Sequence, residues 1–216
     1  MANIVDDLIN DIHAFFKKRK GMMFYSEAEF QQELAYFLRQ RHRNATIHLE
    51  YPLENLFSQK EKERIDIVVE ENGEFVPIEL KYKTKKLKLE EQIFGSSESI
   101  GLREQLATPD NRCEIWDDVE RIESIKKKYP NVPGGIVVVL TNEPGFWKND
   151  GTISGLSVKD GITAKPQHIS YERGELNREG EYEIKWNDWQ TVASQHPDEI
   201  KRTAANKQFR YLCLKI

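Results

Sequence analysis

The chain of 216 residues is poor in the features that mark secreted and membrane proteins. It has only two cysteines, Cys113 and Cys213, which are too few for the disulfide framework of an extracellular domain. No apolar run approaches the roughly 20 residues that a transmembrane helix needs. Asp6, Asp7 and Asp11 do not fit the start of a secretory signal peptide. The sequence therefore predicts a cytoplasmic protein with reduced cysteines and no membrane segment.

Several kinds of catalytic site are missing as well. There is no glycine-rich phosphate loop, no nucleophile elbow and no internal repeat, so no nucleotide cofactor is expected. The net charge of −4 gives no overall preference for nucleic acid, although a local basic patch can bind it on an acidic protein. Zinc is not expected, because the histidines lack ligand spacing; they are His13, His42, His48, His168 and His196.

The most informative stretch is residues 64–81, which has the pattern of a β-hairpin. Two runs rich in β-branched residues flank Asn72 and Gly73, the strongest short-range signal for a two-residue hairpin turn. With these two residues as the loop, Glu71 pairs with Glu74, and the register of the whole hairpin is fixed.

That register sets Asp66 directly opposite Glu79, and Arg64 opposite Lys81. Directly opposed residues have Cβ atoms about 4.5–5.5 Å apart, so the two carboxylates repel unless a cation lies between them. A divalent metal ion is the simplest such cation. The alternation of side chains puts Asp66, Glu79 and Lys81 on one face of the hairpin. The opposite face is predicted to join the core through Ile65, Ile67, Val69, Val76, Ile78 and Leu80.

Asp66 on one strand, followed by Glu79-Leu80-Lys81 on the next, resembles the active-site signature of the PD-(D/E)XK nuclease superfamily. The resemblance implies that Asp66 and Glu79 bind Mg²⁺, for which Mn²⁺ would substitute, and that the backbone carbonyl of Leu80 joins them. It implies that Lys81 holds or activates the attacking water and offsets phosphate charge. The sequence departs from the motif at Ile65, where the family name has proline.

The order of the predicted elements agrees with the same family. Helix, three strands, helix and strand (αβββαβ) is the core of the restriction-endonuclease-like fold, an α/β/α sandwich with a central mixed β-sheet. We expect this core within about 26–142, extra C-terminal strands within about 143–216, and one domain over 1–216. The predicted elements are helices over 3–20, from Ser26 (a capping box) and over 114–129, strands over 46–51 and 136–140, a second hairpin from 168–176 and 181–186, and a last strand over 210–216.

Other acidic residues compete for places at this site. The family often places a glutamate of the second helix near the metal, and Glu33 is the match by its position on the helix; the alternative is a solvated surface residue. Glu50 is a second candidate for that role. Asp117, Glu120 and Arg121 of the following helix could reach the rim of the site or form an exposed charged face.

A run of lysines follows the motif. Beside the catalytic strand, such a run would contact a phosphate backbone without reading sequence; the alternative is an ordinary solvated loop. Residues 92–112 lack periodicity and are predicted to form a long loop that could cover the substrate. The lysines proposed to bind nucleic acid are Lys83, Lys85, Lys86 and Lys88.

The sequence thus predicts a metal-dependent nuclease that hydrolyses phosphodiester bonds, with DNA as the expected substrate. One alternative is a binding module or accessory subunit that has the fold without the chemistry. Another is an unrelated α/β protein whose charged hairpin is merely surface. Endonuclease or exonuclease action and any sequence specificity are left open. A homodimer would help double-strand cleavage, but no interface is identifiable in the sequence.

Overall fold

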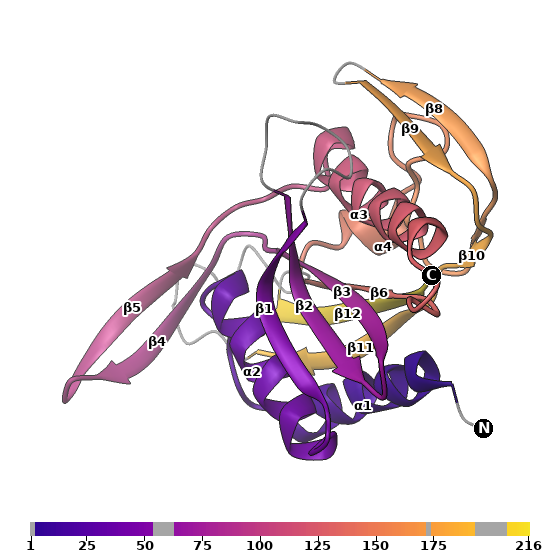
Figure 1. Ribbon diagram of the computed structural model, residues 1–216. Helices are drawn as coiled ribbons and strands as arrows, with labels where there is room; N and C mark the ends of the chain where they lie inside the picture. Colours follow the sequence, from indigo (N-terminus) through magenta and orange to yellow (C-terminus); the bar gives the residue numbers. More distant parts are fainter. Residues whose placement is uncertain (1–2, 54–62, 172–173, 193–206) are drawn as a thin grey trace.

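The computed structural model describes residues 3–53, 63–171, 174–192 and 207–216, and it has a mixed α/β architecture around a six-stranded sheet (Figure 1). Neighbouring strands are antiparallel except for the central pair β3 and β6, which is parallel. Across the sheet the strands are β1 (Thr46–Leu53), β2 (Glu63–Glu71), β3 (Glu74–Lys83), β6 (Ile136–Thr141), β12 (Gln208–Lys215) and β11 (Trp186–Thr191).

Helices cover both faces of this sheet (Figure 1). On one face lie α1 (Ile4–Lys18) and α2 (Glu27–Arg41), and on the other lie α3 (Pro109–Lys128) and the short α4 (Gly145–Lys148). Ser26 is confirmed as the N-cap of α2, because its hydroxyl accepts a hydrogen bond from the Glu29 amide. The Glu29 carboxylate accepts from the amide of Tyr25, one residue before the N-cap, so the predicted capping box is formed only in part. No helix in the described part of the chain is long and apolar enough to cross a membrane.

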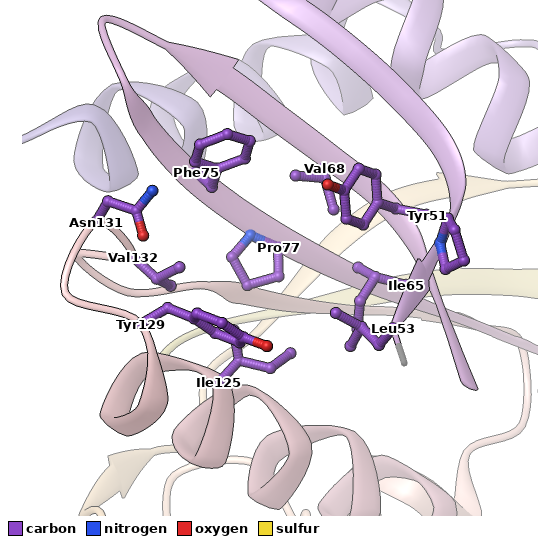
Figure 2. Close-up of a pocket in the computed structure, with 11 residues that line it drawn as sticks. Tyr51, Leu53, Ile65, Val68, Phe75, Pro77, Ile125, Tyr129, Asn131 and Val132 are labelled. Carbon is purple, nitrogen blue, oxygen red and sulfur yellow. The ribbon is translucent and has the colours of Figure 1, made fainter. Parts of the chain in front are cut away.

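The core is divided by the sheet into two large clusters. Every residue of β6 is buried, as its unbroken apolar run predicts. Ile136, Val138 and Leu140 pack with α1 and α2, whereas Val137 and Val139 pack with α3. A third, smaller cluster lies beside the C-terminal end of α3 and lines a hollow, which we call the α3 pocket (Figure 2); its buried members are Ile65, Val68, Ile125 and Val132.

The core elements follow the predicted order with one addition between β3 and α3. The expected loop over 92–112 is wrong there: β4 (Leu87–Ile93) and β5 (Ser96–Leu102) form a hairpin that stands away from the body (Figure 1). Its turn places both Phe94 and Gly95 at positive φ. Phenylalanine is not a residue that such a turn favours, so Gly95 alone is a weak signal for this hairpin in the sequence.

The C-terminal part extends the sheet and adds small hairpins. The last strand is confirmed as β12, and β11 is the outermost strand beside it. The predicted pairing of 168–176 with 181–186 is wrong, because the first segment forms a hairpin by itself. The additional strands are β7 (Thr163–Ala164), β8 (Gln167–Tyr171), β9 (Gly174–Arg178) and β10 (Tyr182–Glu183), paired as β8 with β9 and β7 with β10.

Candidate functional site

The hairpin of β2 and β3 has the predicted register over its first half. Glu71 pairs with Glu74, and the ladder continues in the same register to Ile67 and Ile78. Beyond that pair the two strands part. From Ile78 onward β3 pairs with β6, while β2 stays against β1. The predicted ladder pair of Asp66 and Glu79 therefore falls at a fork between the strands.

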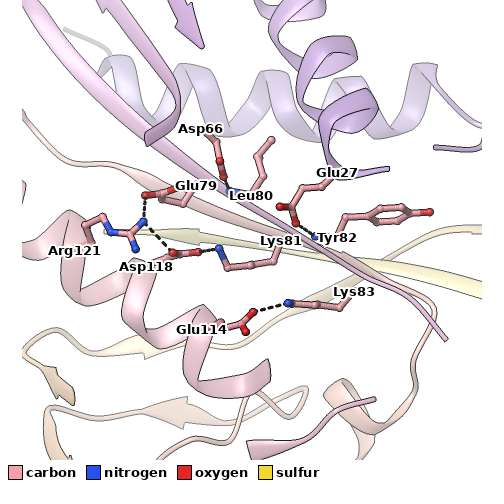
Figure 3. Close-up of polar contacts among 10 residues, drawn as sticks. All are labelled: Glu27, Asp66, Glu79, Leu80, Lys81, Tyr82, Lys83, Glu114, Asp118 and Arg121. Carbon is pink, nitrogen blue, oxygen red and sulfur yellow. Dashed lines mark hydrogen bonds and ion pairs between the residues drawn. The ribbon is translucent and has the colours of Figure 1, made fainter. Parts of the chain in front are cut away.

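The fork leaves one edge of β3 without a partner strand. Two carboxylates accept hydrogen bonds from the backbone amides along this edge. The amide of Leu80 donates to Asp66 Oδ2 at 2.6 Å, and the amide of Tyr82 donates to Glu27 Oε2 at 2.7 Å (Figure 3). Each acid takes the place of a missing ladder carbonyl. Because the N–H and C=O of one strand residue point the same way, the carbonyl of Leu80 should also face the fork.

Asp66 and Glu79 meet at this fork as an acidic pair. Glu79 is almost completely buried, and a hydrogen bond joins its side chain to that of Asp66. Burial raises the pKa of Asp66, although the Leu80 amide and Lys81 oppose the rise. Burial also raises the pKa of Glu79 well above its usual value, and the neighbouring Asp118 and Asp66 raise it further. Both shifts show that burial of these carboxylates outweighs the stabilising effect of the nearby cations Lys81 and Arg121.

On the other side of Asp66, strand β1 is irregular. The β1–β2 ladder is interrupted at Glu50, which has a φ of 51°. This conformation is strained for a residue other than glycine. Gln31 of α2 bridges the interruption, because its amide donates to Glu50 Oε1 at 2.9 Å and to the Asp66 carbonyl at 2.7 Å. Glu50 thus lies beside Asp66, and its charge raises the Asp66 pKa.

Because of the same irregularity, one residue of the predicted core face packs elsewhere. Ile67, Val69, Val76, Ile78 and Leu80 pack in the α1–α2 cluster as expected. Ile65 does not, and packs instead with Val68 in the third cluster. Strict alternation fails at Asp66, where the β1–β2 ladder is interrupted opposite Glu50 and the pairing of β2 with β3 has ended.

Lys81 lies in a ladder of charged pairs between β3 and α3 (Figure 3). Alternate residues of β3 face α3, and their partners recur one helical turn apart on α3. Burial by itself lowers the Lys81 pKa, but Asp118, Glu79 and Asp66 outweigh it and raise the pKa overall, so Lys81 stays charged. The pairs are Glu79 with Arg121 at 2.6 Å, Lys81 with Asp118 at 2.6 Å, and Lys83 with Glu114.

The glutamate of α2 whose carboxylate reaches the fork is Glu27, whereas the predicted Glu33 lies elsewhere. Glu33 forms an ion pair with Arg19 of α1 at 3.1 Å. At about 100° per residue, Glu33 lies about 200° around the helix from Gln31, which faces the fork. Glu27 is one turn before Gln31 and points the same way. Burial raises its pKa.

Helix α3 contributes Arg121 and Asp118, of which only Arg121 was a candidate. Asp117 and Glu120 face the β8–β9 hairpin, where Asp117 accepts from the Tyr171 hydroxyl at 3.4 Å and Glu120 from the backbone of Asn177. Sequence reasoning missed Asp118. The available signal is the spacing of Glu114, Asp118 and Arg121, which matches one helix face.

Two lysines of the predicted nucleic-acid-binding run are already paired with carboxylates and are therefore less free to bind phosphate than predicted. Lys83 is buried in its pair with Glu114, and Lys85 pairs with Glu143 at 3.2 Å. Lys86 is exposed, and Lys88 lies half-buried in β4. The carboxylates therefore neutralise the lysines nearest to the fork, and these lysines form no continuous basic patch.

The donor set at the fork fits a hard divalent cation such as Mg²⁺ or Mn²⁺, which prefers oxygen ligands. In the described part of the chain no group of three or more histidines, cysteines and acids is arranged to hold a metal ion. Asp66 and Glu79 with the Leu80 carbonyl form a smaller set, which water would complete. The cluster also holds more acids than cations: Glu27, Asp66, Glu79 and Asp118 face Lys81 and Arg121, so ionisation of all four acids would leave an excess of two negative charges.

These buried acids predict how metal binding depends on pH. Burial raises the pKa of Asp118 from 3.8 to about 6. An acid with a raised folded-state pKa stabilises the protein below its unfolded pKa, and this contribution is lost as the pH rises through the folded pKa. We expect these groups to stabilise the metal-free protein as the pH falls from about 7 towards 4. Metal binding needs ionised carboxylates and should weaken over the same range.

The measurement is the rise in Tm on adding Mg²⁺, relative to EDTA, at about pH 5 and about pH 7.5. The rise should be clear at the higher pH and small at the lower. An equal rise at both would contradict the assignment of these acids to a metal site.

The chain matches no protein-family model, no curated protein and no solved structure at a significant level. The chemistry of the site therefore rests on its own residues. A buried acidic pair, a lysine held in its charged form and an excess of negative charge can together bind a divalent cation next to a cationic side chain. That combination suits reactions of phosphate esters.

Proposed function

We propose that this protein is a metal-dependent nuclease that hydrolyses phosphodiester bonds, with DNA as the expected substrate. The observation that carries the proposal is the convergence of Asp66, Glu79 and Lys81 at the fork between β2 and β3. The order α2, β1, β2, β3, α3, β6 supports a restriction-endonuclease-like fold.

Asp66, Glu79 and the Leu80 carbonyl would hold Mg²⁺. When bound, the ion lowers the pKa of a coordinated water and stabilises the charge that develops on the phosphate. Glu27 replaces Glu33 as the acid that α2 brings close, since it reaches β3 at the Tyr82 amide. It stands on the α2 side of β3, where it adds to the negative charge that attracts the ion.

Lys81 supplies the cationic group of the reaction. Because its pKa is raised, it cannot act as a general base near neutral pH. It would instead donate a hydrogen bond to the attacking water or to a non-bridging phosphate oxygen and offset the charge that develops there. Asp118 is the positioning residue, because it holds the Lys81 ammonium at 2.6 Å and is itself buried.

The test combines a binding and a cleavage measurement on the same preparation. Mg²⁺ or Mn²⁺ is titrated by calorimetry, and the protein is incubated with plasmid, linear duplex, single-stranded DNA and RNA, in metal and in EDTA. We expect binding, and cleavage that EDTA abolishes. Metal binding without cleavage of any of these would favour the alternative of a non-catalytic module, and the absence of both would overturn the proposal.

A further inference from the structure

The α3 pocket has the size and lining of a site for one flat, uncharged group (Figure 2). It encloses about 470 Å³, within the range of small-molecule sites. Its floor is the third cluster, and its rim carries three half-exposed aromatic rings, those of Tyr51, Phe75 and Tyr129. None of the described residues that line it is charged.

A backbone hydrogen bond fixes one wall of the pocket. The amide of Phe75 donates to the carbonyl of Asn131 at 2.9 Å, which ties the segment after α3 to strand β3. Pro77 lies on the same stretch of β3, before the ladder with β6 begins at Ile78, so its missing N–H breaks no bond there. The Asn131 side chain lies at the edge of the pocket (Figure 2), and its amide can both donate and accept.

The pocket adjoins the acidic fork on the same side of the sheet. Ile65 in its floor directly precedes Asp66 in the chain. Pro77 is two residues from Glu79, about 7 Å along the strand, and Ile125 is one helical turn, about 5.4 Å, from Arg121. A group bound in the pocket would therefore have its attached backbone close to the fork.

We propose that the α3 pocket binds an unpaired nucleobase, so that the nuclease acts on single-stranded or locally unpaired nucleic acid. This inference rests on the proposed function. Stacking of bases on aromatic side chains is the usual means of holding single strands. A base within a duplex is stacked and paired and does not reach such a pocket. The neutralised lysines beside the fork also leave little charge for a duplex backbone.

The experiment measures binding of a fluorescein-labelled oligothymidylate, alone and in a duplex, by fluorescence anisotropy in EDTA. Tyr129→Leu removes one ring of the rim, and Tyr129→Phe keeps it. Tyr36→Leu is the matched control, because Tyr36 is an exposed tyrosine on α2 outside the pocket. Phe75→Leu is a second pocket variant, and thermal melting checks that each protein is folded.

We expect Tyr129→Leu and Phe75→Leu to weaken single-strand binding about 10-fold, the effect of losing one base stack. Tyr129→Phe and Tyr36→Leu should bind as the wild type does, and duplex binding should not change. No single-strand binding by the wild type, equal losses for single strand and duplex, or no loss in either pocket variant would overturn the pocket assignment.

Cleavage assays in Mg²⁺ separate this inference from the proposed function. Cleavage that is unaffected by Tyr129→Leu on every substrate would overturn the pocket and leave the nuclease. Binding of the single strand through Tyr129, without cleavage of any substrate, would support the pocket and overturn the nuclease.

Discussion

Replacing Asp66 by asparagine is expected to abolish Mg²⁺ binding and to lower cleavage by more than about 100-fold, since even groups that only support a metal ligand are worth 10–100-fold. Asparagine keeps an oxygen that can accept from the Leu80 amide, so the edge of β3 stays satisfied. It removes the charge that the metal needs. The fold should therefore survive, and Tm in EDTA should be equal to or above that of the wild type, because a buried acidic charge is lost.

Glu33→Gln is the matched control for that experiment. It makes the same change from acid to amide, on the helix that faces the fork, at the residue that sequence position alone selects. The structure places Glu33 against Arg19, so we expect unchanged metal binding and cleavage. Activity retained in Asp66→Asn, or an equal loss in Glu33→Gln, would refute the assignment of the metal site to the fork.

The hairpin could be predicted because its determinants are local. Asn72 and Gly73 both adopt the positive φ that their turn needs, and one such turn fixes the pairing down to Ile67 and Ile78. What could not be predicted is the point where the ladder ends. It depends on β6, which arrives from more than fifty residues away and takes over the pairing of β3.

Sequence position alone does not identify the acid of α2 that reaches the fork, for a related reason. A helical wheel shows that Glu33 borders the apolar stripe, but it does not show which border faces the fork. The packing of α2 against its neighbours decides which border faces the fork. Arg19 of α1 pairs with Glu33 on one border, and the Tyr82 amide of β3 donates to Glu27 on the other. The spacing of the charged residues of α3 shows that they share a helix face, but their pairing with β3 follows only from the packing of α3 against that strand.

Arg121→Ala is the second change with a large expected effect, and it tests the charge balance of the site. Arg121 contacts both Glu79 and Asp118, and both carboxylates are almost fully buried. Removing one partner of a buried pair costs about 3–5 kcal/mol. Because a quarter of the Arg121 side chain is exposed, we expect a loss near the lower end, about 3 kcal/mol, in the free energy of unfolding in EDTA. Urea denaturation measures it.

Lys127→Ala is the control on the same helix. Lys127 pairs with Glu179 at 2.5 Å, but both side chains are largely exposed. Exposed pairs contribute about 0.2–1 kcal/mol, so this variant should be nearly as stable as the wild type. A loss in Arg121→Ala as small as the one expected for Lys127→Ala would mean that the contacts of Arg121 are ordinary surface pairs.

Adding Mg²⁺ then distinguishes a metal site from a purely structural ion-pair network. A metal ion bound by Glu79, as proposed, would compete with Arg121 in the wild type, and displacing the guanidinium would reduce the net free energy of metal binding. Without Arg121 the ion meets an acidic cluster with one cation fewer. The stabilisation by Mg²⁺, which grows with the ratio of free ion to Kd, should therefore be larger in Arg121→Ala than in the wild type. A structural network would give no stabilisation by Mg²⁺ in either protein. A larger stabilisation by Mg²⁺ in Arg121→Ala than in the wild type would therefore show that the buried acids of β3 and α3 form a cation site, and no stabilisation in either protein would show that they form only structural ion pairs.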